Sequence, residues 1–114
     1  MTVFTLSDLA DIIERRADAD AERSYTRSLL DGGRERTAKK FGEEAVEAVI
    51  AVIVGDKNAV TMEAADVVYH LLVMLKASGV TVADVLAELE RRTAQSGVDE
   101  KASRRAASGR SADG

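Results

Sequence analysis

Apolar residues recur at helical spacing through most of the first 93 residues, with polar residues at the positions between them. The pattern predicts helices over residues 5–17, about 35–54, from Asp56 or Asn58 to about 77, and 81–93. Thr5 with Asp8, and Thr81 with Asp84, have the spacing of capping boxes at two of the helix starts. Because the chain contains no proline and only 4% aromatic residues, its composition also favours helices over a sheet. The sequence therefore predicts an all-α fold.

The ends of the folded region are marked by changes in composition. Between the first two predicted helices, Ser24 and Thr26 are possible caps, and the pair at 32–33 (Gly-Gly) predicts a break. Residues 94–114 contain one large aliphatic residue, Val98. A segment with so little apolar surface cannot offset the entropy of ordering. We therefore expect a single domain over residues 1–93 and a disordered tail over residues 94–114.

The two middle helices are apolar on nearly every side, most clearly over residues 45–54 and 67–75. A helix of this kind must be buried all round, and a chain of 114 residues has too few other helices to cover both. We therefore expect helical hairpins that assemble as a homodimer around a shared four-helix-bundle core.

Carboxylates interrupt these apolar helices at matched distances from Gly55. Glu47 and Glu63 lie eight residues before and after this glycine, and Glu44 and Asp66 lie eleven residues before and after it. Each pair on one helix has a spacing of three, which places both side chains on the same face. In an antiparallel hairpin all four carboxylates meet at one level, roughly 12 to 17 Å from the turn.

A solvated acidic face with salt bridges is the alternative interpretation of these carboxylates. It suits Glu43, which can pair with Lys39, and partly suits Glu44 with Lys40. Glu47 and Glu63 have no lysine or arginine three or four residues away. Clustered carboxylates repel one another unless a cation neutralises them, and an all-oxygen cluster suits Mg²⁺ or Mn²⁺. We therefore predict a divalent-cation site.

Such a cation typically works on phosphates. The chain has no GxxxxGK[ST] loop, so basic side chains are expected to position the substrate: Lys40 above all, with Lys39, Arg34 and Arg36 as further candidates. The net charge of −4 argues against nucleic acid as a partner. The longest apolar run, AVIAVIV, is too short for a membrane span of roughly 20 residues. The start lacks a signal-peptide pattern and cysteine is absent, which fits the cytoplasm.

Several segments together resemble a known family. Glu43-Glu44-x-x-Glu47 followed by Glu63-x-x-Asp66 is similar to the EExxE…ExxD signature of the all-α, MazG-like nucleoside triphosphate pyrophosphohydrolases. The segments KKFGEEAVEAVIA, EAADVVYHLLVML and the SYT at 24–26 resemble, within that superfamily, the phosphoribosyl-ATP pyrophosphohydrolases of histidine biosynthesis. The resemblance covers roughly residues 5–93. It implies hydrolysis of phosphoribosyl-ATP to phosphoribosyl-AMP and pyrophosphate, the second step of that pathway.

The same resemblance implies roles for individual residues. It makes Glu44, Glu47, Glu63 and Asp66 the ligands of Mg²⁺, and it makes Glu43 either a base that acts on the water or a surface residue. Glu43, Glu44 and Glu47 are thus the candidate catalytic residues.

His70 is either a core residue or a partner that supports Asp66 from outside the metal's ligand shell. Tyr25 is either a substrate-binding or a packing residue. The alternatives to this function are a housekeeping (d)NTP pyrophosphatase of the same superfamily, a ferritin-like di-iron carrier and a non-catalytic dimerisation module. A ferritin-like di-iron site requires Glu-x-x-His ligand pairs, and neither Glu44 nor Glu63 has a histidine three residues later.

Overall fold

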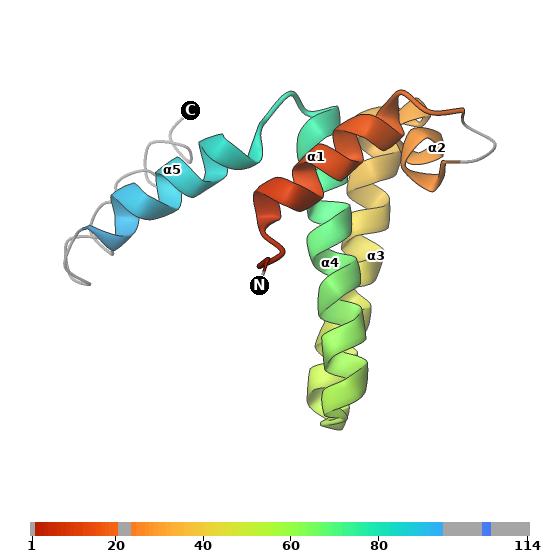
Figure 1. Ribbon diagram of the computed structural model, residues 1–114. Helices are drawn as coiled ribbons and strands as arrows, with labels where there is room; N and C mark the ends of the chain where they lie inside the picture. The colour runs from red at the N-terminus through yellow and green to blue at the C-terminus, as the bar shows by residue number, and fades with distance from the viewer. Residues whose placement is uncertain (1, 21–23, 95–103, 106–114) are drawn as a thin grey trace. The chain divides into compact units, whose positions relative to one another are not determined.

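The computed structural model describes residues 2–20, 24–94 and 104–105. Five helices make up the secondary structure of this part of the chain (Figure 1): α1 (Leu6–Ala17), α2 (Tyr25–Asp31), α3 (Gly33–Val54), α4 (Lys57–Ala77) and α5 (Val82–Thr93). This confirms the all-α class. The chain divides into two compact units, Met1–Val82 and Ala83–Gly114. Apart from Ala94 and residues 104–105, the predicted tail lies outside the described residues.

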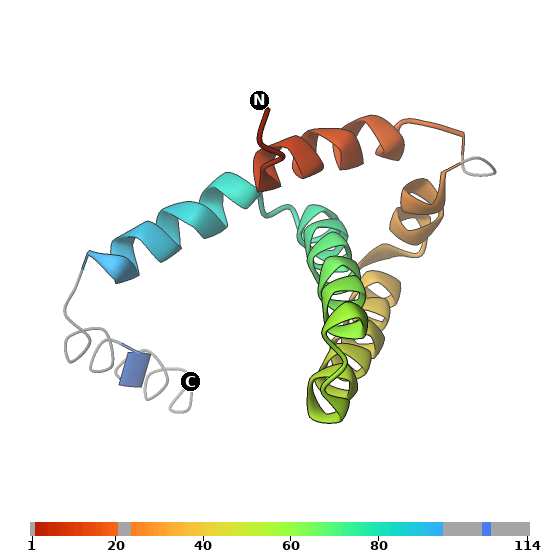
Figure 2. The ribbon, with the colours of Figure 1, turned by 60° about the horizontal axis from the view of Figure 1, so that its bottom comes forward.

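The central feature of the first unit is an antiparallel hairpin of α3 and α4, whose helices lie side by side in Figures 1 and 2. Gly55 ends α3 in the left-handed conformation (φ 87°), and its N–H donates to the carbonyl of Ala51. The side chain of Asp56 then accepts hydrogen bonds from the N–H groups of Asn58 and Ala59 and so caps α4. A turn of two residues therefore joins the helices and sets their register.

The helices α1 and α2 pack against one end of this hairpin. Thr5 and Asp8 form the predicted capping box of α1. Ser24 caps α2 by accepting from the N–H of Arg27, which selects the first of the two predicted caps. The helix α2 itself was not predicted, because its seven residues are too few for a clear periodicity. Gly32 and Gly33 form the predicted break, and α3 begins at Gly33 rather than near residue 35.

The buried core lies where α1, α2 and the C-terminal half of α4 meet. Its centre consists of Ile13, Leu29, Leu72 and Val73. The helix α4 is long and apolar enough to cross a membrane. It also supplies two of these core residues, and core helices of soluble proteins pass the same test, so we interpret it as the core helix of the hairpin.

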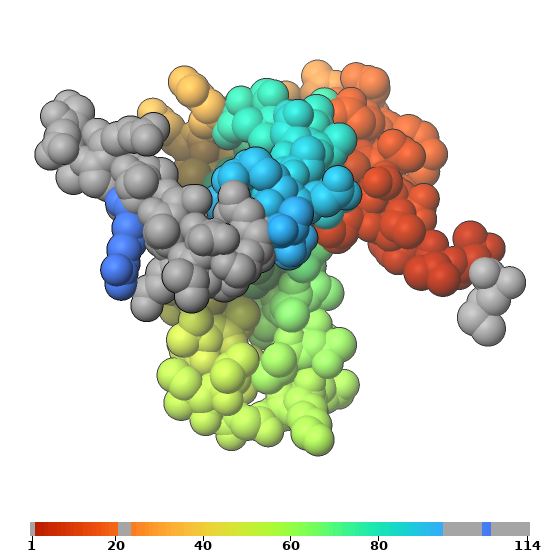
Figure 3. Space-filling view, turned by 90° about the vertical axis from the view of Figure 1, so that its left-hand side faces the viewer, coloured from red at the N-terminus to blue at the C-terminus, as the bar shows by residue number. Residues whose placement is uncertain are grey.

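Away from this core, the described residues of the first unit do not cover the hairpin. The end near Gly55 extends beyond α1 in the space-filling view (yellow and green in Figure 3). Large apolar side chains of α3 are between 55% and 79% exposed there: Val46, Val49, Ile50, Val52, Ile53 and Val54. The described part of the first unit therefore leaves open the apolar surface that the expected dimer would bury, and the dimer stays a prediction.

The second unit contains α5, which has charged residues near its end. Glu88 accepts hydrogen bonds from the guanidinium groups of Arg91 and Arg92 at 2.6 to 3.1 Å. These bonds, those from Arg91 first, lower the pKa of Glu88 from 4.5 to about 2.

The turn at Gly55 allows a direct test of the hairpin. Gly55→Ala should destabilise the protein by about 1 kcal/mol, because alanine is strained in the left-handed conformation. Gly42→Ala is the matched control, since Gly42 lies inside α3 with nothing within 4 Å of an added Cβ. It should stabilise the protein by about 0.5–1 kcal/mol. Urea unfolding measures both, and equal effects would contradict the assigned turn.

Candidate metal centre

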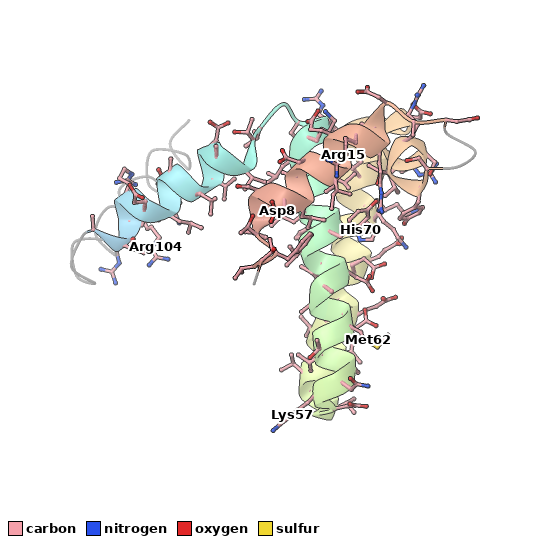
Figure 4. All side chains as sticks on the ribbon, viewed as in Figure 1. Asp8, Arg15, Lys57, Met62, His70 and Arg104 are labelled. Carbon is pink, nitrogen blue, oxygen red and sulfur yellow. The ribbon has the colours of Figure 1, made fainter. Side chains whose placement is uncertain are left out.

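Three carboxylates from the two hairpin helices come together at one level. Glu44 projects from α3 and is buried. On α4, Glu63 is half-buried and Asp66 is exposed. One oxygen of each lies within 4.8 Å of the others. Figure 4 labels Met62 and His70, which flank this acidic stretch of α4 in the sequence. The matched distances from Gly55 thus do bring carboxylates of both helices together.

Glu47, the fourth predicted ligand, lies beside this cluster rather than inside the triad. It is exposed, and its interactions show which carboxylates it faces. The negative charge of Glu44, followed by that of Glu63, raises the pKa of Glu47 above its ordinary value. Glu47 is therefore close enough to Glu44 and Glu63 for their charges to repel its own.

Glu63 contributes an oxygen to the cluster that has no hydrogen-bond donor among the described residues. Its Oε2 atom is buried and accepts no hydrogen bond from the residues that the structure describes. A buried carboxylate oxygen without a partner is costly, and a bound cation would remove that cost. The donors are all carboxylate oxygens, which hard cations such as Mg²⁺ and Mn²⁺ prefer. The residues present fit such an ion.

Lys40 neutralises part of the cluster from one side. Its Nζ lies 3.1 Å from Oε1 of Glu44 and 3.9 Å from Oε2 of Glu43. The hydrogen bond to Glu44 is the largest cause of the raised pKa of Lys40. The pairing of Glu43 with Lys39 that the sequence allowed is not formed among the described residues, because Glu43 faces Lys40 instead. One lysine against four or five carboxylates leaves a net negative site.

His70 is buried next to the cluster and is held from both sides. Its Nδ1 lies 2.8 Å from the backbone carbonyl of Asp66, and its Nε2 lies 3.2 Å from the hydroxyl of Tyr25. A carbonyl only accepts, so Nδ1 carries a proton, and in the neutral ring Nε2 accepts from Tyr25. His70 thus joins the backbone of a candidate ligand to the first residue of α2.

Two cavities flank the cluster, and Tyr25 lines both. The basic cavity, about 440 Å³, is formed by Tyr25, Leu29, Arg36, Lys39, Lys40 and Glu43. The mixed cavity, about 570 Å³, is formed by Arg16, Ala19, Ser24, Tyr25, Thr26, Asp66, Tyr69 and His70. Of these lining residues, the sequence predicted Tyr25, Arg36, Lys39 and Lys40 as candidates for binding substrate, and His70 and Asp66 as candidates at the metal site. It carried no signal for Arg16 or Tyr69, because their positions depend on how α1 and α2 pack on α4. Arg34 lines neither cavity.

This combination of fold and site defines a class of protein. A helical hairpin that gathers carboxylates from both of its helices is the arrangement of the all-α, MazG-like pyrophosphohydrolases, which the sequence resembles. Residues 6–93 match the family model described as phosphoribosyl-ATP pyrophosphohydrolase. The chain belongs to this family, and the resemblance inferred from the sequence is confirmed.

Curated relatives agree over almost their whole length. The chain is 58% identical to the phosphoribosyl-ATP pyrophosphatase of Methylobacterium radiotolerans over 107 residues, which cover 94% of this chain and all of the relative. It is 56% identical to that of Rhizobium johnstonii over 104 residues, 91% of this chain and 97% of the relative. That of Rhizobium rhizogenes is 54% identical over 104 residues, 91% of this chain and 100% of the relative.

Charge removal should affect Glu47 and Glu88 in opposite directions. Because the pKa of Glu47 is raised in the fold, the protonated acid favours folding, and this contribution is lost as pH rises through the folded value. Glu47→Gln should therefore leave the metal-free protein at least as stable at neutral pH. The lowered pKa of Glu88 contributes stability above about pH 4.5 that is lost as pH falls toward 2.

Thermal melts in EDTA at pH 7 measure both changes. Glu88→Gln is the control and should lower Tm slightly. An earlier melt for Glu47→Gln would show that Glu47 is stabilised by a salt bridge rather than strained by its neighbours.

Proposed function

We propose that this chain hydrolyses phosphoribosyl-ATP to phosphoribosyl-AMP and pyrophosphate, the second step of histidine biosynthesis, in the cytoplasm. This proposal rests on the chain's membership of the family. It also rests on relatives named phosphoribosyl-ATP pyrophosphatase, which align with the chain over nearly their whole length. The acidic cluster supplies the matching chemistry. Nothing in residues 2–20 or 24–94 favours a general (d)NTP pyrophosphatase instead.

The reaction breaks the anhydride bond between the α- and β-phosphates. Water supplies the oxygen that completes one product, and its protons leave to a base and to solvent. Mg²⁺, held by Glu44, Glu47, Glu63 and Asp66, would neutralise phosphate charge and acidify the water when bound. Mn²⁺ would suit the same oxygens. The exposed carboxylate of Glu43 follows the basic helix face that lines the basic cavity, and this location supports Glu43 as the proposed base.

The basic cavity is the proposed site of the leaving pyrophosphate. Arg36, Lys39 and Lys40 line it together with the hydroxyl-bearing ring of Tyr25. Lys40 also pairs with Glu44, so the cavity adjoins the acidic cluster directly. Three cations beside a metal site are suited to a group with several negative charges. His70 is proposed to hold Asp66 and Tyr25 in position through its two ring nitrogens.

The proposal includes a homodimer. The apolar side chains of α3 near the turn are exposed in one chain, and a second hairpin would bury them in a four-helix core.

Replacing one of these side chains tests the dimer. Ile53 is 79% exposed, and Ile53→Glu should convert a dimer to a monomer at micromolar concentration. Val3→Glu is the matched control, since Val3 is 74% exposed but lies outside the hairpin. Light scattering gives the mass of each. A monomeric parent protein would contradict the proposal.

Product analysis tests the function itself. The purified chain with phosphoribosyl-ATP and Mg²⁺ should release phosphoribosyl-AMP and pyrophosphate in equal amounts, and faster than it acts on a panel of (d)NTPs. Asp66→Asn removes one charge from the cluster and should lower turnover at least about 100-fold. Asp11→Asn, an exposed change on α1, is the control and should stay active. Full activity of Asp66→Asn would contradict the assigned site.

A further inference from the structure

The mixed cavity has no part in the steps proposed so far, although it opens onto the acidic cluster through Asp66. Three elements build it: the end of α1, the start of α2 and the middle of α4. Its volume of about 570 Å³ falls in the range of about 300–1,000 Å³ that is usual for small-molecule sites. A ligand group that extends from Asp66 toward the end of α1 and the start of α2 would enter it.

Some of the hydrogen-bonding groups that line this cavity already bond to other groups of the protein. Ser24 donates to the carbonyl of Arg16 and caps α2. Because Nδ1 of His70 faces the carbonyl of Asp66, a ring with one proton accepts from the Tyr25 hydroxyl at Nε2, and the Tyr25 oxygen then faces a ligand as an acceptor. Thr26 and Tyr69 form a hydroxyl pair, in which one hydroxyl donates to the other. The proton of the second hydroxyl stays available, so the cavity keeps one neutral donor and one neutral acceptor.

Among the described residues that line the cavity, Arg16 is the one cation and Asp66 is the one carboxylate. Within the described part of the chain, the Arg16 side chain forms no ion pair. The cavity is therefore close to neutral overall, unlike the basic cavity with its three cations and one carboxylate. A polyphosphate suits the basic cavity better. A single phosphate attached to a group with hydroxyls suits the mixed cavity, because guanidinium binds phosphate and the acceptors bind hydroxyls.

The substrate of the proposed reaction carries both kinds of group. Phosphoribosyl-ATP has two riboses, both bonded to the adenine ring. One ribose carries the triphosphate, and the second carries a monophosphate. We propose that the mixed cavity binds this second, phosphorylated ribose, with Arg16 binding its monophosphate and Tyr25 accepting from a ribose hydroxyl. The assignment rests on the proposed function. Under this assignment, Arg16 is the residue that makes the site specific for phosphoribosyl-ATP over ATP.

Binding of two nucleotides to the full-length chain tests this assignment. The probes are phosphoribosyl-AMP, which carries the second ribose, and AMP, which lacks it. Arg16→Gln should weaken phosphoribosyl-AMP about tenfold or more and leave AMP within about twofold, while KM for phosphoribosyl-ATP rises more than kcat falls. Arg16→Lys should retain part of the affinity. Arg15→Gln, one residue away and outside the cavity (Arg15 is labelled in Figure 4), is the matched control and should change neither.

The outcomes separate this inference from the function on which it rests. Equal weakening of both nucleotides by Arg16→Gln, or no weakening of either, would overturn the subsite while leaving the activity in place. Failure of the parent protein to hydrolyse phosphoribosyl-ATP would overturn the proposed function and the subsite with it.

Discussion

The register of α3 against α4 is the constraint on which the site depends. Gly55 and Asp56 form the whole turn, so residues at equal distances from Gly55 come to lie opposite one another. Glu44 on one helix thereby reaches Asp66 on the other. One inserted residue would rotate the following helix by about 100° and move it by about 1.5 Å. The carboxylates of α4 would then point away from those of α3. The short turn is therefore part of the site.

The gathered carboxylates oppose stability in the absence of a cation. Glu47 is held near Glu44 and Glu63, and its pKa is raised as a result. Glu63 also carries a buried oxygen without a hydrogen-bond donor in the described structure. Elsewhere the same kind of residue is well paired, as Glu88 is by two arginines. The core helices thus carry an arrangement that folding alone does not favour, which is typical of functional sites.

The sequence predicted the hairpin and the acidic level because both follow from periodicity and counting. Helix faces repeat every 3.6 residues, so Glu44 and Asp66 are placed by arithmetic once the turn at Gly55 is recognised. The cavities could not be predicted in the same way. Arg16 and Tyr69 line one of them only because α1 and α2 pack on α4, and seven residues of α2 carry too little periodicity to reveal it. Lys39 shows a second limit, since helical spacing allowed its pairing with Glu43 but could not exclude Lys40 as the partner.

The position of a bound cation tests the central claim most directly. Crystals of the protein grown with Mn²⁺ would show the ion by its anomalous scattering. The account predicts one or more peaks between the carboxylates of Glu44, Glu63 and Asp66, with oxygen ligands at about 2.0–2.2 Å as expected for a cation that replaces Mg²⁺. A peak elsewhere, or none at this cluster at saturating Mn²⁺, would contradict it.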